Sequence, residues 1–289
     1  MSYTLTVLKD KKILIIGGSS GIGRAVAAAS LAYGASVVIA SSRQPKVNAA
    51  VELLKKDIQG EAGANVSGQV VDIKDFKSLT EFLTSEAPFD HLVITAGDLA
   101  GGFPKPPNLA RTLNSWIDLW SMCTEDSVSK RRTKFESQYA LLAFHECGNN
   151  LIHPGGSIVG TIAAAESRPM PGVAFFSGVL GAIATATRGL ALDLKPLRIN
   201  AISPGIVDTE IFSSFPPEVR THLMDSTLQK LPVGHIGTAE ELAEAYIFAM
   251  KASTLYNTSH KTYNLIIFID QCQFLTGQII TVDGGGNLA

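Results

Sequence analysis

Short apolar runs recur along the chain and alternate with segments whose apolar residues repeat at helical spacing. Seven runs have the length of strands: residues 11–16, 36–40, 68–72, 89–95, 155–161, 197–202 and 278–282. Most are continuous and rich in β-branched residues, which is typical of strands buried on both faces of a parallel sheet. The pattern therefore predicts an α/β fold with a doubly wound, parallel, seven-stranded sheet and helices on both faces.

The first strand leads into a glycine-rich turn. This turn consists of Gly17-Gly18-Ser19-Ser20-Gly21-Ile22-Gly23, and it begins an alanine-rich helix that should run to about Tyr33. Glycines let the backbone turn tightly and approach a pyrophosphate, and the free N–H groups at a helix start attract its charge. Gly17, Ser19, Ser20, Gly21 and Ile22 are therefore predicted to hold a dinucleotide.

Composition limits the class of protein. A chain of 289 residues without a Pro/Gly/Ser-rich linker suits a single domain over residues 1–289. A net charge of −2 and a pI near 6.3 give no general attraction to nucleic acid or anionic membranes, so a small-molecule substrate is favoured. Cys123, Cys147 and Cys272 lack metal-ligand spacing, and no metal site is predicted. With no secretory signal pattern, we expect a cytoplasmic protein.

One uncharged stretch, residues 169–187, has the length of a membrane span. It contains Pro169 and Pro171 and many Gly, Ala, Ser and Thr residues. We therefore interpret it as part of a buried helix and expect no membrane association.

Five motifs, in order, resemble those of the short-chain dehydrogenase/reductase (SDR) family. They are the glycine turn, Thr95-Ala96-Gly97, Gly156-Ser157-Ile158-Val159, the segment 198–205 (RINAISPG) and the segment 276–285 (TGQIITVDGG). The resemblance spans nearly the whole chain. It implies a Rossmann-like fold and a nicotinamide dinucleotide cofactor.

The end of the second strand favours NADP(H). Many relatives that use the unphosphorylated cofactor carry an acid there, whereas this chain has Ser41-Ser42-Arg43, followed by Lys46. Guanidinium forms charge-assisted bonds to a 2′-phosphate that a carboxylate would repel. The alternative is that Arg43 and Lys46 are merely solvated loop charges.

The resemblance also implies three further cofactor contacts. Asp72 and Ile73 would meet the adenine edge, and Ala96 and Gly97 would lie beneath the adenosine ribose. Pro204, Gly205, Val207 and Thr209 would hold the nicotinamide carboxamide.

The family's proton-transfer residues are absent at the matching positions. Phe176 stands in place of the tyrosine acid/base and Leu180 in place of the lysine, while Ala163 and Lys134 replace the serine and asparagine. A phenyl ring cannot exchange a proton, and leucine supplies neither charge nor hydrogen bonds. Carbonyl reduction by the usual mechanism is therefore not expected, and neither Ser177 nor Tyr139 is expected to substitute.

A different polar set remains near the expected nicotinamide position: Glu166, Arg131 and Lys134. Glu166 begins the loop 166–172, which should overhang the substrate, so its carboxyl group is a candidate acid, with a basic residue orienting cofactor or substrate. The alternative is a surface ion pair between Glu166 and Arg168, beside a solvated basic run.

A narrower resemblance points to fungal NADPH-dependent reductase/Diels–Alderases of bicyclic diazaoctane indole alkaloid biosynthesis. These lack the Tyr/Lys pair, use an acid and an arginine, and carry a Pro-x-Pro-Gly loop, similar to residues 169–172 here. Their acid is aspartate, and an aromatic residue follows their glycine where this chain has Val173. The resemblance implies reduction of an iminium-like or otherwise activated substrate. The alternatives are an inactive cofactor-binding subunit and a cyclase that uses NADP structurally.

Two segments, 97–135 and 252–273, exceed the usual family length. The second is an atypical insert with three open explanations: a lid or dimer arm, a disordered insert, or translated intron sequence, which we favour. A homodimer or homotetramer built on helices around 133–150 and 173–194 is also expected.

Overall fold

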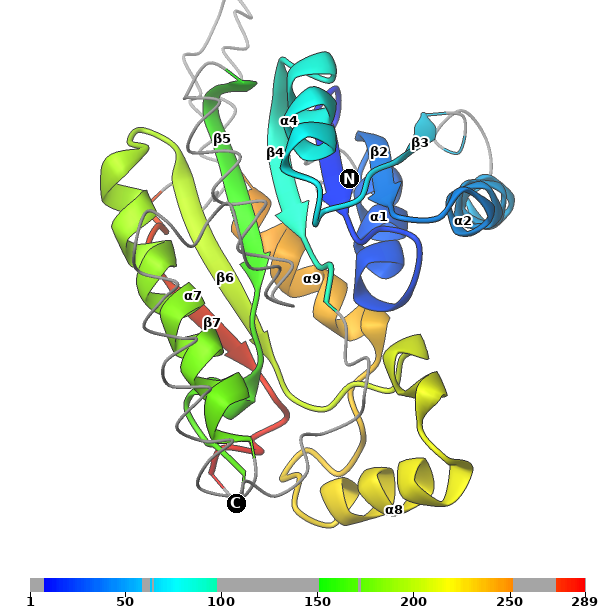
Figure 1. Ribbon diagram of the computed structural model, residues 1–289, viewed down its shortest axis with the longest axis vertical. Helices are drawn as coiled ribbons and strands as arrows, with labels where there is room; N and C mark the ends of the chain where they lie inside the picture. The colour runs from blue at the N-terminus through cyan, green and yellow to red at the C-terminus, as the bar shows by residue number, and fades with distance from the viewer. Residues whose placement is uncertain are drawn as a thin grey trace, which may run out of the picture.

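The computed structural model describes residues 8–58, 63, 65–97, 151–170, 173–251 and 274–288, and these contain a seven-stranded parallel sheet (Figure 1). The strands are β1 (Lys12–Ile16), β2 (Ser36–Ser41), β3 (Val66–Val70), β4 (Phe89–Ile94), β5 (Ile152–Thr161), β6 (Arg198–Pro204) and β7 (Ile279–Val282). Their order is β3-β2-β1-β4-β5-β6-β7, and all neighbours are parallel. The predicted Rossmann-like fold class is confirmed.

Strand order reverses at β1. Leu14 of β1 lies opposite Val38 of β2 on one side and Leu92 of β4 on the other. In open α/β sheets, a reversal of strand order is accompanied by a crevice beyond the carboxyl ends of the strands that flank it. Ligands of open α/β sheets bind at such a point.

Helices cover both faces of the sheet (Figure 1). The helices α1 (Gly21–Ala32), α2 (Gln44–Asp57) and α9 (Ala239–Met250) pack on one face, and α4 (Phe76–Ser85) and α7 (Ala174–Asp193) pack on the other. Alternate strand residues feed the two cores: Ile13 and Ile15 join the first, Leu14 and Ile16 the second. This two-sided burial explains why the strand sequences are continuously apolar.

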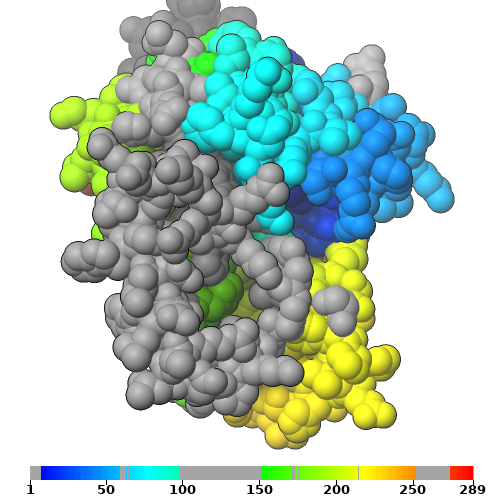
Figure 2. All heavy atoms as spheres, in the orientation of Figure 1, coloured from blue at the N-terminus to red at the C-terminus, as the bar shows by residue number. Residues whose placement is uncertain are grey.

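Short elements follow the carboxyl ends of β5 and β6. The 3₁₀ helix η3 (Ala164–Glu166) follows β5, and η4 (Glu210–Ser214) and α8 (Pro217–Leu228) follow β6. Figure 1 shows α8 beyond the end of the sheet, and no residue of α8 is fully buried. On the face drawn in Figure 2, this yellow segment lies next to the blue amino-terminal part of the chain.

Three predicted strands had boundaries that were wrong by two or three residues, one of them β6, which ends at Pro204 rather than at 202. The third strand is Val66–Val70, two residues earlier than predicted, and β5 begins at Ile152 rather than 155. The third strand is an edge strand of mixed burial in which Val70 is exposed, so the apolar pair Val70-Val71 was a misleading guide. In the described part of the chain, no helix has the length and apolar character needed to cross a membrane.

Candidate functional site

The glycine turn is shaped by close backbone packing. Gly17 has a φ of +92°, and its N–H donates to the carbonyl of Ala40 at 2.8 Å. A Cβ on Gly17 would lie 2.5 Å from the Ala96 nitrogen, and one on Gly23 would lie 2.3 Å from the Gly17 carbonyl oxygen. Only glycine fits these contacts, so the structure brings the predicted residues Gly17 and Ala96 together.

The start of α1 is suited to an anion. Ser20 is the extended N-cap residue, but its side chain does not cap the helix. The Ser19 hydroxyl instead donates to the Ser41 hydroxyl at 3.0 Å, which ties the turn to the end of β2. First-turn N–H groups that a cap residue leaves free are the groups that bind phosphate in such turns.

The residues predicted to select NADP(H) lie beside this turn. Arg43 is the extended N-cap residue of α2, and Ser42, Arg43 and Lys46 are all exposed. Among the described residues, no ion pair involves Arg43 or Lys46. Two exposed cations thus flank the end of β2, and none of the described carboxylates pairs with them there.

The predicted adenine contacts are arranged differently from each other. Asp72 is exposed, and its Oδ1 accepts a hydrogen bond from the Lys74 N–H at 3.0 Å. Ile73 is buried in the core that α4 and α7 cover, so its side chain packs rather than faces solvent. Gly97, which is predicted to lie beneath the ribose, follows shortly after β4, and no described atom lies within 4 Å of a Cβ built on it.

The segment after β6 lies beside the glycine turn. The Gly205 N–H donates to the carbonyl of Val282 at 3.0 Å, and Val207 forms a β-bridge with Gly237. A Cβ on Gly21 would lie 3.2 Å from the Thr209 Cβ. The predicted residue Thr209 is therefore in direct reach of the glycine turn.

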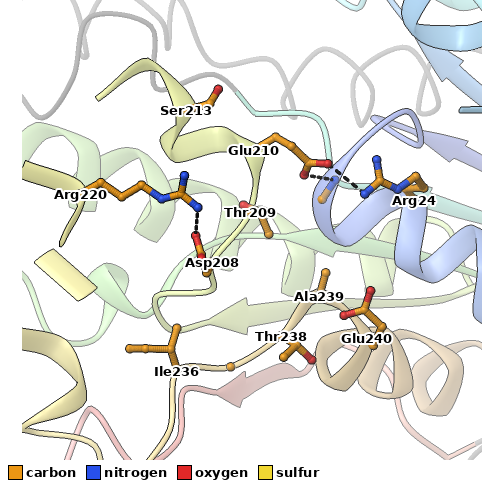
Figure 3. A pocket seen from close by; sticks show the side chains of 12 residues that line it. Arg24, Asp208, Thr209, Glu210, Ser213, Arg220, Ile236, Thr238, Ala239 and Glu240 are labelled. Carbon is orange, nitrogen blue, oxygen red and sulfur yellow. Dashed lines mark hydrogen bonds and ion pairs between the residues drawn. The ribbon is translucent and has the colours of Figure 1, made fainter. Parts of the chain in front are cut away.

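Two residues that the sequence did not suggest, Glu210 and Arg24, also meet at this turn. Glu210 Oε2 accepts a hydrogen bond from the Gly21 N–H at 2.8 Å, and Arg24 Nη2 lies 2.9 Å from Glu210 Oε1 (Figure 3). Partial burial raises the pKa of the Glu210 carboxyl group, but hydrogen bonds from backbone N–H groups and the charge of Arg24 outweigh this effect and lower it. The carboxylate is thus held in its ionised form.

These residues border a cavity of about 590 Å³. Figure 3 shows a second ion pair in it, between Arg220 Nη2 and Asp208 Oδ1 at 2.5 Å. The lining residues are Gly21, Arg24, Asp208, Thr209, Glu210, Ser213, Arg220, Ile236, Gly237, Thr238, Ala239 and Glu240.

The residues predicted to stand in place of the usual proton-transfer residues are apolar and packed. Leu180 is 6% exposed within the core, and Ala163 and Phe176 are half-buried against the same core. Ser177 is buried, and its hydroxyl has no hydrogen-bond partner among the described residues. This hydroxyl lies in the interior, so the structure gives no support for Ser177 as a replacement acid.

Glu166 ends η3 and is half-buried. Its neighbours are tied to the carboxyl-terminal turn: Arg168 Nη1 donates to the Gly286 carbonyl at 2.6 Å, and Asn287 Nδ2 donates to Ser167 Oγ at 2.9 Å. Within the described residues, the alternative Glu166–Arg168 ion pair is not formed. The loop position is thus fixed by contacts more than 100 residues away.

Several predicted residues lie outside the described part of the chain. They are Arg131, Lys134, Tyr139, the helix around 133–150, Pro171, Gly172 and the insert 252–273. In the described ranges, no group of three or more His, Cys, Asp or Glu residues could hold a metal ion.

Comparisons with known proteins agree with the geometry. The model of the SDR-like Rossmann domain matches residues 5–269. The chain is 29% identical to the short-chain dehydrogenase/reductase malC of Malbranchea aurantiaca, over 89% of this chain and 94% of malC. It is 34% identical to the short-chain dehydrogenase/reductase fsr5 of Gibberella fujikuroi, over 84% of this chain and 89% of fsr5. The solved structure of the MalC reductase/Diels-Alderase superposes with a TM-score of 0.77 at 26% identity, covering 99% of this chain and all of that one.

Proposed function

The chain belongs to the short-chain dehydrogenase/reductase (SDR) family, and from this premise we propose that it is an NADPH-dependent oxidoreductase of an activated, iminium-like substrate in fungal specialised metabolism. One observation carries the proposal. The close backbone packing around Gly17 and the exposed cation Arg43 fit a cofactor, while Phe176 and Leu180, which we predict stand at the proton-transfer positions, pack against the apolar core. The likeness to a reductase/Diels-Alderase supports it.

The residues present fit a phosphorylated dinucleotide. Gly17 and Gly23 have no side chain where the turn packs against the residues that follow β4. Ser19 and Ser41 are hydrogen-bonded to each other, and Arg43 offers a guanidinium for a 2′-phosphate. NADPH, when bound, supplies a hydride. A substrate that is already cationic at a C=N bond accepts this hydride and becomes an amine without gaining a proton, so a tyrosine acid is not required.

Cofactor selectivity is the first test. Isothermal titration should show NADPH binding about tenfold or more tightly than NADH, equivalent to about 1.4 kcal/mol. Arg43→Ala should remove most of this preference. Lys55→Ala, at the far end of the same helix, should leave it unchanged. Equal affinities in the parent chain, or a preference that survives Arg43→Ala, would refute the NADP(H) assignment.

The proposed acid, Glu166, is tested by a pair of probes. N-methyl-3,4-dihydroisoquinolinium is a permanent cation and needs only hydride, whereas neutral 3,4-dihydroisoquinoline must also gain a proton. Glu166→Gln should slow reduction of the neutral imine about 100-fold or more and leave reduction of the cation within about twofold. Glu52→Gln, an exposed acid on α2, should change neither rate. Equal slowing with both probes would contradict the acid role.

A substrate screen separates this function from its alternatives. NADPH oxidation by iminium probes but not by simple ketones is expected. If no imine, iminium or pathway substrate oxidises bound NADPH, a cofactor-binding subunit becomes the better interpretation. If product forms without NADPH oxidation, the cofactor is structural.

We also propose a homodimer or homotetramer that uses α7. This helix buries Val179, Leu180 and Ile183 but leaves Gly178 and Ala182 exposed in the single chain. A second copy of the chain would cover this exposed side of the helix. Light scattering at micromolar concentration should report an oligomer, and a monomer would contradict this.

A further inference from the structure

Glu210 lies where negative charge from a bound phosphate is expected. Its carboxylate accepts the Gly21 N–H hydrogen bond at 2.8 Å and pairs with Arg24 at 2.9 Å (Figure 3). Gly21 is the first residue of α1, and first-turn N–H groups bind anions. The protein's own carboxylate therefore already fills part of this anion site.

The segment after β6, which carries Thr209 and Glu210, lies against the glycine turn. Thr209 lies against Gly21, since a Cβ there would be 3.2 Å from the Thr209 Cβ, and Glu210 continues from Thr209 into η4. A dinucleotide held by both the glycine turn and the segment after β6 has to pass between these contacts. The hydrogen bond from the Gly21 N–H to Glu210 joins these two segments at the start of α1.

We propose that Glu210 is an internal anion that competes with the cofactor phosphates for the start of α1 and thereby sets cofactor affinity. The inference rests on the proposed binding of NADPH. Binding requires the carboxylate to release the Gly21 N–H, which then becomes available to a phosphate oxygen. Arg24 loses its partner in the same movement and can turn to the phosphate.

The contact is weak enough to open. The side chains of Arg24 and Glu210 are 34% and 47% exposed, and solvent-exposed ion pairs contribute little stability. Apparent affinity falls in proportion to the fraction of molecules in the binding-competent state. If the contact is closed in about nine molecules out of ten, it weakens cofactor binding about tenfold.

The neighbouring ion pair supplies a matched control. Asp208 pairs with Arg220 at 2.5 Å in the same cavity, and both its side chain and that of Glu210 are about half-exposed. No hydrogen bond joins Asp208 to the start of α1 among the described residues. Asp208→Asn therefore removes the same charge from the same segment without freeing the Gly21 N–H.

Calorimetric titration of the full chain with NADPH, and with ADP-ribose, which lacks nicotinamide, tests the proposal. Glu210→Gln should lower the Kd of both ligands about tenfold, and Asp208→Asn should stay within about twofold of the parent. Arg24→Gln should raise both Kd values, because the carboxylate then stays while the neutralising cation is lost. Thermal melting of each variant confirms that it is folded.

The outcomes separate this inference from the proposed function. If Glu210→Gln leaves the affinity for NADPH and ADP-ribose unchanged, or lowers it, the inference is wrong and the proposed function stands. A lowered affinity would show that Glu210 helps to hold the cofactor. Absence of binding to any folded variant overturns the proposed function and the inference together.

Discussion

The two walls of the crevice differ in what forms them: backbone atoms form one, and side chains form the other. The wall after β1 and β4 is made of backbone and small residues, where Gly17 and Gly23 allow atoms to approach within distances that no Cβ permits. The wall formed by η3 and α7 is made of side chains, and there Ala163, Phe176 and Leu180 pack against the core. A substitution that alters the backbone packing of the first wall disrupts the fold. A substitution of a side chain in the second wall can change its chemistry and leave the fold intact.

This difference leads us to expect that one crevice can keep a cofactor cradle while the side chains of its other wall change. Replacing a tyrosine and a lysine by phenylalanine and leucine, as the sequence predicts here, would add apolar contacts to the core without disturbing the backbone. Family membership therefore shows the fold, whereas the cofactor contacts and the reaction stay predictions.

The largest expected effect is at Gly23. A methyl group there would lie 2.3 Å from the Gly17 carbonyl oxygen and 2.4 Å from Thr95 Oγ1, so Gly23→Ala should lower the free energy of unfolding by about 3 kcal/mol and weaken NADPH binding more than tenfold. Gly189→Ala in α7 meets no atom within 4 Å and should stabilise the protein by about 0.5–1 kcal/mol. Urea unfolding measures both, and similar values would remove the contrast between the walls.

The apolar wall is tested by restoring the family's pair. Leu180→Lys places a charge at a site 6% exposed and should cost about 2–3 kcal/mol of unfolding free energy, while Leu180→Met should cost less than about 1.5. Phe176→Tyr, at a half-buried site, should stay within about 1 kcal/mol.

The double variant Phe176→Tyr/Leu180→Lys should bind NADPH and still fail to reduce simple ketones. We expect this because the double variant leaves Ala163 and Lys134 in place of the family's serine and asparagine, and because the proposed proton delivery runs from Glu166. A double variant that is stable and reduces ketones well would show that only two side chains separate this chain from an ordinary carbonyl reductase.

A buried histidine joins the two halves of the sheet. His91 of β4 lies opposite Ser157 of β5, with 2.9 Å between His91 Nδ1 and Ser157 Oγ, and burial lowers its pKa from 6.5 to about 3. Between these values the unfolded chain binds a proton that the native protein does not. Stability should therefore fall by about 1.4 kcal/mol for each pH unit below 6.5.

Urea unfolding at pH 7, 6, 5 and 4 measures this slope. His91→Gln should be less stable at pH 7 and show a shallower decline with acid, because it cannot titrate. His153→Gln, at an exposed position of β5, should keep the parent slope. Identical slopes for the parent and His91→Gln would place the acid sensitivity elsewhere in the chain.

Local pattern was sufficient for most of the fold. The strands β1, β4 and β6 are almost wholly buried, so their apolar runs were unambiguous, and the glycine turn could be recognised because Gly17 and Gly23 answer a local steric demand. The edge strand β3 has mixed burial and was misplaced by two residues for that reason.

Contacts between distant side chains could not be predicted in the same way. Glu210 meets Gly21 across 189 residues, and Arg168 meets Gly286 across 118. Neither pair has a spacing or a motif that selects it, because both depend on how loops return to the same edge of the sheet. The sequence analysis predicted that Thr209 contacts the cofactor, and this prediction pointed to the neighbourhood of Glu210 but not to Glu210 itself.

The smallest expected effect is from deleting residues 252–273. Both borders of this insert are held by residues of β6: Arg198 donates to the carbonyls of Ala249 and Met250 at 2.7 and 3.0 Å, and Asn200 Nδ2 donates to the carbonyl of Leu275 at 2.9 Å. Because the borders are fixed independently of the insert, a chain that joins Lys251 to Phe274 should change the free energy of unfolding by less than about 1 kcal/mol. NADPH affinity should stay within about twofold. Arg198→Met, which removes one anchor, should cost more in the parent and in the deleted chain alike. If the deletion instead costs more than about 3 kcal/mol, the insert contributes to the core, and the intron interpretation is wrong.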